Sequence, residues 1–165
     1  MKPFFLSIFI ALFLFSFTVV LIKPVDSDDA VTFTIKNFGL NINGFFKGLK
    51  GAINWAAANP SASSFNVSVD AATINTGIDA RDNHLRKQEY FNAEIYPLIT
   101  FASTAVTATN ITGNLTIKGI TKQISFPFTA TPSPGGYLFE GSFIINRRDF
   151  KVGGNSMVLG DNVTV

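Results

Sequence analysis

Apolar and polar residues alternate along most of this chain, and this alternation constrains its fold more than any other feature. In segment 31–36, Val31, Phe33 and Ile35 are apolar, and the residues between them are Thr, Thr and Lys. Successive side chains of a β-strand point to opposite faces, so the pattern predicts a strand with one buried face. It returns in segments 49–55, 65–70, 99–105, 115–118, 124–128, 137–145 and 157–165.

Proline and glycine refine this pattern. Turn-forming residues separate the strands, most clearly in segment 131–136. Pro127 lies inside a predicted strand and lacks a backbone donor, so we expect it at a sheet edge or a bulge. Gly113 and Gly141 lie inside strands, where glycine marks a bend or a close approach of another group.

One segment has a different character. Residues 79–91 are rich in charge and contain no β-branched residue, and Asp79 is suited to cap a helix. We therefore expect a short helix of two to three turns that starts at Asp79 and ends before Asn92. Seven or eight short strands with one helix predict an all-β protein, either an antiparallel barrel or a sandwich.

The N-terminus carries a targeting segment. Lys2 precedes an apolar run from Phe4 to Ile22 that is long enough to cross a bilayer. We favour a signal peptide over residues 1–18, with the folded domain over 19–165, because segment 19–22 suits a first strand. An uncleaved anchor extending to Ile22 is the alternative. Both predict export, to the periplasm or outside the cell.

Composition excludes several functions. The chain has no Cys and one His, so a cysteine-bound or multi-histidine metal site is not expected. Thirteen Lys and Arg against eleven Asp and Glu give no excess for a nucleic-acid partner. Neither a Ser-His-Asp arrangement nor a phosphate-binding glycine loop is recognisable. We therefore expect no catalytic residue and no cofactor, and a protein that is not an enzyme.

Phenylalanine is unusually frequent. Of 18 Phe, six lie in the N-terminal segment and twelve remain for the domain. A small barrel either fills its interior with such side chains or encloses one ligand, and composition does not choose between these. Two basic groups are available at a barrel mouth, around Arg81 with His84 and at Arg147. Solvated charge, helix capping and strand pairing are the simpler interpretation of both.

Several motifs, in order, resemble the YceI-like domain family over residues 23–165. The most specific is Ile74-Asn75-Thr76-Gly77 followed by Arg81-Asp82-Asn83-His84-Leu85-Arg86. The others are Val31-Thr32-Phe33-Thr34-Ile35-Lys36-Asn37-Phe38-Gly39, Tyr90-Phe91, Tyr96-Pro97-Leu98-Ile99-Thr100-Phe101, Leu115-Thr116-Ile117-Lys118-Gly119-Ile120-Thr121-Lys122 and Asn146-Arg147-Arg148-Asp149-Phe150.

The resemblance implies an extended, lipocalin-like antiparallel barrel of eight strands with one helical excursion. It also implies an apolar tunnel that holds a polyisoprenoid or another long amphiphilic lipid. Membrane contact would then be limited to lipid exchange or to an uncleaved N-terminal segment. The expected tunnel residues are Phe33, Ile35, Phe101, Phe126, Phe139 and Phe143. Arg81, His84 and Arg147 are the expected mouth or head-group residues.

Two further expectations can be tested by geometry. The alternative function is an exported interaction module whose barrel is filled by its own side chains, and a cavity above about 300 Å³ would distinguish the two. The last strand stops at Val165, earlier than in the family, so we expect a weakly closed barrel seam there. Sheet edges near that end leave a homodimer open.

Overall fold

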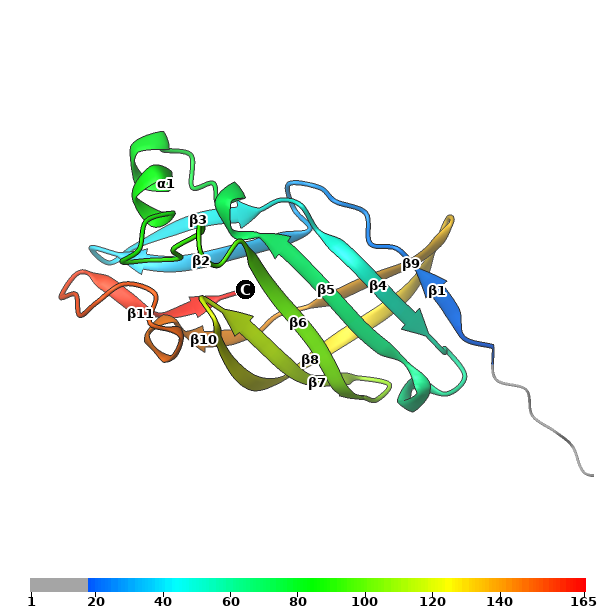
Figure 1. The fold of residues 1–165 in the computed structure, drawn as a ribbon. Helices are drawn as coiled ribbons and strands as arrows, with labels where there is room; N and C mark the ends of the chain where they lie inside the picture. The colour runs from blue at the N-terminus through cyan, green and yellow to red at the C-terminus, as the bar shows by residue number, and fades with distance from the viewer. Residues whose placement is uncertain (1–17) are drawn as a thin grey trace, which may run out of the picture.

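The strands form two antiparallel sheets that curve into a nearly closed barrel (Figure 1). This computed structural model describes residues 18–165, so the predicted signal segment lies almost entirely outside the described residues. The strands are β1 (Val20–Ile22), β2 (Val31–Asn37), β3 (Leu40–Phe46), β4 (Lys50–Trp55), β5 (Ser64–Asp70), β6 (Leu98–Val106), β7 (Asn110–Ile117), β8 (Ile120–Ser133), β9 (Gly136–Gly141), β10 (Ile144–Asn146) and β11 (Leu159–Thr164). The helix α1 spans Asp79–Leu85, and three 3₁₀ turns cover Pro60–Ala62, Ala71–Thr73 and Arg147–Phe150.

The larger sheet has the order β1-β4-β5-β6-β7-β8-β9, and the smaller has the order β10-β11-β2-β3. The predicted antiparallel barrel is therefore confirmed, although the described residues contain eleven strands and not eight. Segment 137–145 divides into β9 and β10, and β1 is the short strand expected at 19–22. β3 was not predicted, because its outward residues and Gly44 weaken the alternation.

Pro127 lies where β8 changes its partner. Residues Ile120 to Pro127 pair with β7, and Phe128 to Ser133 pair with β9. A residue without an N–H group is tolerated at this position because the ladder changes sides there. The proline thus marks the junction between two parts of one long strand.

The helix has the lower of the two lengths predicted, about two turns. It begins after Ile78, with Asp79 as its first residue and not its cap, and ends at Leu85. The chain then continues in turns, in which the Phe91 N–H donates to the Leu85 carbonyl at 3.0 Å. These turns bring Tyr90 and Phe91 against the barrel. Among residues 18–165, no helix is long and apolar enough to cross a membrane.

The C-terminal strand is well paired, contrary to the expected weak seam. β11 lies between β10 and β2, and Val165 exchanges two backbone hydrogen bonds with Phe143 at 2.8 and 2.9 Å. The outer strands of the larger sheet are instead β1 and β9, which do not pair with each other. The backbone ladder of the larger sheet therefore ends at β1 on one side and at β9 on the other.

Candidate functional site

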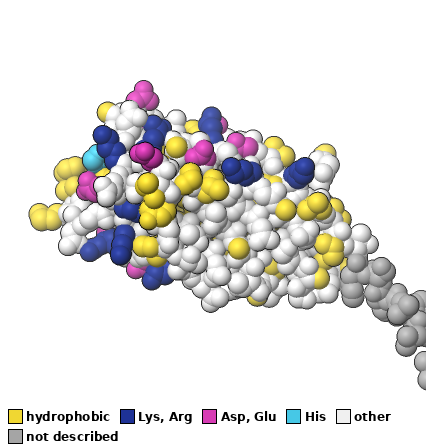
Figure 2. Space-filling view, viewed as in Figure 1, with side chains coloured by type: hydrophobic (Ala, Val, Ile, Leu, Met, Phe, Trp, Pro, Cys, Tyr) yellow, Lys and Arg dark blue, Asp and Glu magenta, His cyan; other side chains and the backbone are white. Residues whose placement is uncertain are grey.

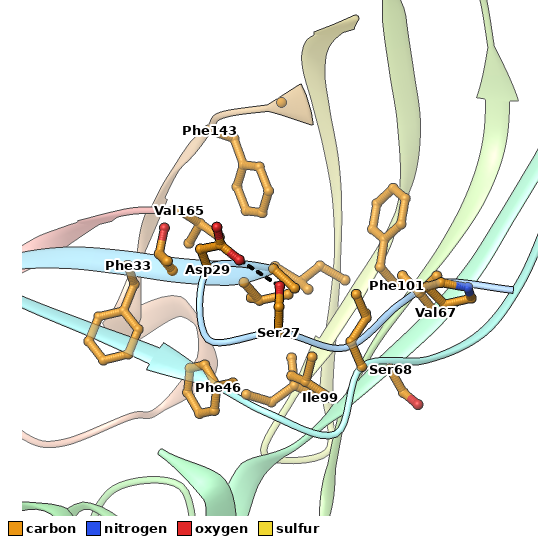
Figure 3. A pocket seen from close by; sticks show the side chains of 18 of the residues that line it. Ser27, Asp29, Phe33, Phe46, Val67, Ser68, Ile99, Phe101, Phe143 and Val165 are labelled. Carbon is orange, nitrogen blue, oxygen red and sulfur yellow. Dashed lines mark hydrogen bonds between the residues drawn. The ribbon is translucent and has the colours of Figure 1, made fainter. Parts of the chain in front are cut away.

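A cavity of about 1060 Å³ occupies the barrel interior, and its walls come from both sheets (Figure 3). All six predicted tunnel residues line it: Phe33, Ile35, Phe101, Phe126, Phe139 and Phe143. Each was chosen because it lies on the apolar face of an alternating strand, and that face is the inner face of the barrel. Their role in binding remains a prediction.

The phenylalanines of the wall have room because glycine lies beside several of them. An ideal Cβ on Gly113 would lie 2.5 Å from Cζ of Phe101, and one on Gly141 would lie 3.0 Å from Cε2 of Phe126. A Cβ on Gly44 would collide with the ring of Phe33. Each ring packs over the backbone of a glycine on a neighbouring strand, where there is no side chain. The rings can therefore lie against the wall and leave the centre of the barrel free. The close approach predicted for Gly113 and Gly141 is thus confirmed, whereas Gly119, also expected inside a strand, lies in the β7–β8 turn.

One end of the barrel is filled. Trp55, Phe65, Phe128, Tyr137 and Phe139 form an aromatic plug, in which the ring centroid of Trp55 lies 5.4 to 6.3 Å from those of the other four. These distances are typical of favourable edge-to-face packing. Phe139 belongs to both regions, because it packs in the plug and also lines the cavity.

Arg81 borders the cavity near α1. Its Nε donates to Oγ1 of Thr76 at 2.6 Å, and its Nη2 donates to the Thr76 carbonyl at 2.7 Å. The buried carboxylate of Asp82 accepts from the N–H and the hydroxyl of Thr76. Within residues 18–165, Nη1 of Arg81 has no hydrogen-bond partner, so this guanidinium retains a donor beside the cavity.

Arg147 lies at the cavity wall but is only 4% exposed. Its guanidinium donates to the carbonyls of Val152, Gly154, Leu159 and Gly160, and Nη2 also forms an ion pair with Asp161 at 2.8 Å. The head-group role expected for Arg147 stays a prediction. In the structure, its donors tie the 3₁₀ turn at Arg147–Phe150 to β11 and to the loop before it.

His84 does not line the cavity. Its ring is exposed on α1 and packs edge-on against Tyr90, with ring centroids 5.0 Å apart. Tyr90 itself lines the cavity. The structure therefore brings Arg81 to the cavity but leaves the predicted His84 outside it.

A strap formed by residues 23–30 runs beside the cavity, and sequence reasoning missed it. The Asp26 carboxylate accepts from the N–H groups of Gly48 and Leu49, both at 3.0 Å, and Asp28 pairs with Lys47 at 2.8 Å. The hydrogen bonds from the backbone of Leu49 and Gly48 hold the pKa of the Asp26 carboxyl below its ordinary value. The acidic stretch 26–29 was the available signal, but its partner is more than 15 residues away.

The strap and β9 both border the cavity. Ser27 and Asp29 of the strap are among its lining residues (Figure 3). Tyr137 of β9 also lines it. Since β1 and β9 share no ladder, side chains and the strap close this part of the wall. Among residues 18–165, no group of three or more His, Asp or Glu is placed to hold a metal ion.

An antiparallel barrel with a large apolar interior is the class of protein that these features define. The sequence model of the YceI-like domain family matches residues 23–165, and the chain belongs to that family. A UPF0312 protein from Ectopseudomonas mendocina is 34% identical over 134 residues, which are 74% of this chain and 70% of that protein.

Solved structures share the fold of this chain. The crystal structure of Burkholderia cenocepacia BcnA has a TM-score of 0.76 and 25% identity, and the match covers 81% of this chain and 89% of BcnA. A polyisoprenoid-binding domain from Saccharophagus degradans has a TM-score of 0.57 over 89% of this chain and 94% of its own. At 14% identity, the latter shows a shared fold alone.

Proposed function

We propose that this chain is an exported, non-enzymatic binding protein that holds a long-chain polyisoprenoid or a similar amphiphilic lipid in its barrel. The observation that carries the proposal is the cavity of about 1060 Å³ with a wall rich in phenylalanine and aliphatic residues. Ligand pockets commonly measure about 300–1,000 Å³, so this cavity suits a large ligand. The polyisoprenoid-binding domain from Saccharophagus degradans, which shares the fold, supports the ligand class.

The lipid tail would gain its affinity from burial. Each methylene group removed from water contributes about 0.8 kcal/mol, so roughly ten contribute about 8 kcal/mol before the cost of ordering the chain. That gain needs no catalytic group. The single histidine of the sequence, His84, lies outside the cavity.

The polar head would lie near α1, next to Arg81. Nη1 of Arg81 is a charged donor at the cavity, and an arginine suits a phosphate or carboxylate. The aromatic plug closes the opposite end, so the tail would extend from Arg81 towards Phe139. Arg147 would support the wall without contacting the head.

The alternative, an interaction module with a filled core, is less well supported. The cavity exceeds the threshold of about 300 Å³ that separates the two functions. Only the plug end matches the filled-core description.

Native mass spectrometry of the protein, exported by its own host and purified without detergent, tests the proposal. We expect an added mass that matches a prenyl or another long-chain lipid, together with an N-terminus that reports cleavage near Thr18. A bare protein that stays bare after incubation with prenyl lipids would contradict lipid binding.

A matched pair of variants localises the binding. Phe143→Glu places a charge in the cavity. Ile144→Glu places the same charge one residue further along the chain, on the exposed outer surface of the barrel. We expect the first variant to lose the lipid and the second to keep it, with both folded by circular dichroism. Equal lipid content in both would place the ligand elsewhere.

A further inference from the structure

Two turns at one end of the barrel form an apolar tip, defined here as Phe38, Leu40, Met157 and Val158. The Phe38 N–H donates to the Val158 carbonyl at 2.9 Å, so the β2–β3 turn and the loop before β11 lie side by side (Figure 1). Phe38 is 75% exposed, Leu40 70% and Met157 fully exposed. Hydrophobic side chains protrude at this end of the molecule, on the left of Figure 2.

Phe38 occupies an unfavourable turn position. It has φ +49° and Gly39 has φ +78°, in a two-residue turn between the paired residues Asn37 and Leu40. Such a turn strongly favours Asn, Asp or Gly at the first central position, because left-handed backbone disfavours other side chains. An exposed phenylalanine there weakens the turn and gains little packing within the barrel.

The β7–β8 turn is an internal comparison. Lys118 and Gly119 have φ +50° and +73°, so Lys118 occupies the position that corresponds to Phe38. Its ammonium group donates to the carbonyls of Lys151 and Glu89 at 2.8 and 3.1 Å. The side chain of Lys118 thus contributes to the fold, whereas that of Phe38 is directed to solvent.

The tip continues the cavity wall. Ile42 and Phe46 of β3 line the cavity, and Leu40 lies on the same face of that strand by alternation. Asn37 and Leu159, which adjoin the two tip segments, also line the cavity. An apolar row therefore runs from the cavity along β3 to the exposed end of the barrel.

Exposed positive charge lies on the segments that carry the tip. The segments 31–46 and 147–161 contain four Lys and Arg against two Asp; Arg147 is buried, so Lys36, Arg148 and Lys151 are the exposed cations. One of these acids, Asp161, already pairs with Arg147 at 2.8 Å and contacts Arg148 at 3.7 Å. Lysine and arginine side chains are visible around the tip in Figure 2. This combination matches the negative surface of an anionic bilayer.

We propose that the apolar tip inserts into the interface of an anionic lipid bilayer and that lipid passes between the bilayer and the cavity over Leu40. The lipid-transfer part rests on the proposed function, whereas docking does not. A specific protein–protein interface buries at least about 1,200 Å² in total, more than four protruding side chains supply. Two narrow turns with apolar ends can instead enter a deformable lipid surface among the head groups.

The absence of cysteine allows a site-specific test. In the full chain, Met157→Cys gives a single thiol for labelling with an environment-sensitive nitrobenzoxadiazole probe, and Ile144→Cys is the control. Ile144 is 66% exposed and pairs with Thr164, at the opposite end of β11 from the tip. Each labelled protein is titrated with vesicles of phosphatidylglycerol and phosphatidylethanolamine, and with phosphatidylcholine vesicles.

We expect probe emission to rise and shift to the blue only at position 157 and only with anionic vesicles, and to weaken in high salt. A second substitution, Phe38→Asn, should reduce vesicle affinity about tenfold or more, since it removes a large apolar side chain. Because Asn suits this turn, that variant should unfold at the same or higher denaturant concentration. Loss of binding could not then be ascribed to misfolding.

Other results would overturn the proposal. Equal responses at positions 157 and 144 would indicate attachment through another part of the chain. A response at position 157 that rises with protein concentration without vesicles would indicate self-association through the tip. If the purified protein carries lipid but the probe at position 157 does not respond to vesicles, the proposed function stands and docking through the tip is rejected. If the protein is free of lipid but the probe responds, docking stands and the proposed function is rejected.

Discussion

The two ends of the barrel interior use phenylalanine in opposite ways. At the plug, Phe65 and Phe128 are buried and pack around Trp55 with centroid distances of 6.3 and 5.9 Å. Along the cavity, Phe101 and Phe126 are only half-buried, and the second faces Phe143 at 4.7 Å. The difference lies in the remaining neighbours, since rings surround Trp55 in the plug, whereas Phe101 and Phe126 also lie beside Gly113 and Gly141. Residue type alone therefore does not reveal whether a barrel is filled.

The largest effect expected from this comparison is at the plug. Trp55→Ala should destabilise the fold by about 3–5 kcal/mol, because it opens a void among packed rings. Phe143→Ala should cost about 1 kcal/mol, since one side of that ring already faces the cavity. Urea unfolding followed by circular dichroism measures both.

A conservative variant serves as the control at the plug. Within residues 18–165, Nε1 of Trp55 is buried without a hydrogen-bond partner. Trp55→Phe therefore loses volume but no hydrogen bond, and its cost should fall below about 2 kcal/mol. Equal destabilisation by Trp55→Ala and Phe143→Ala would contradict the distinction between plug and cavity.

An intermediate effect is expected at the glycines. In Gly113→Ala, the new Cβ would approach Cζ of Phe101 at 2.5 Å and the Ala102 carbonyl oxygen at 2.6 Å. Ring and backbone must both move, at a cost of about 1–3 kcal/mol. Gly141→Ala meets Phe126 at 3.0 Å and should cost less. Thermal unfolding and bound-lipid content measure both, and a reversed order would show that these contacts do not set the wall.

The smallest effect concerns the strap. The pKa of Asp26 is lowered in the folded protein, so its contribution is present at neutral pH and is lost as pH falls below about 4. The protection factors of the Gly48 and Leu49 amides, which are the exchange rates of an unfolded chain divided by the observed rates at the same pH, should fall over that range while the plug stays protected. In Asp26→Ala these factors should be low at neutral pH as well. Protection factors that are independent of pH in the native chain would show that the strap is not held by this carboxylate.

The sequence predicted the strand-rich fold and the six wall residues, because alternation assigns each side chain to one face. It did not predict β3, whose Gly44 lies beneath Phe33 and so interrupts the apolar pattern. It gave Arg147 and His84 the same role, since local sequence does not show that one guanidinium is enclosed by distant carbonyls. The strap depends on Asp26 meeting residues 48 and 49, a contact between segments that no local pattern encodes.

The glycines beside the wall phenylalanines have a consequence for how such a barrel diversifies. Each of Gly44, Gly113 and Gly141 sets the depth at which one ring lies, and none of them sets the number of strands. A substitution at one of these glycines changes the width of the cavity by displacing one phenylalanine ring, while the register of the strands stays the same. Barrels of one topology can therefore suit lipids of different thickness by point substitution, without insertions or new strands.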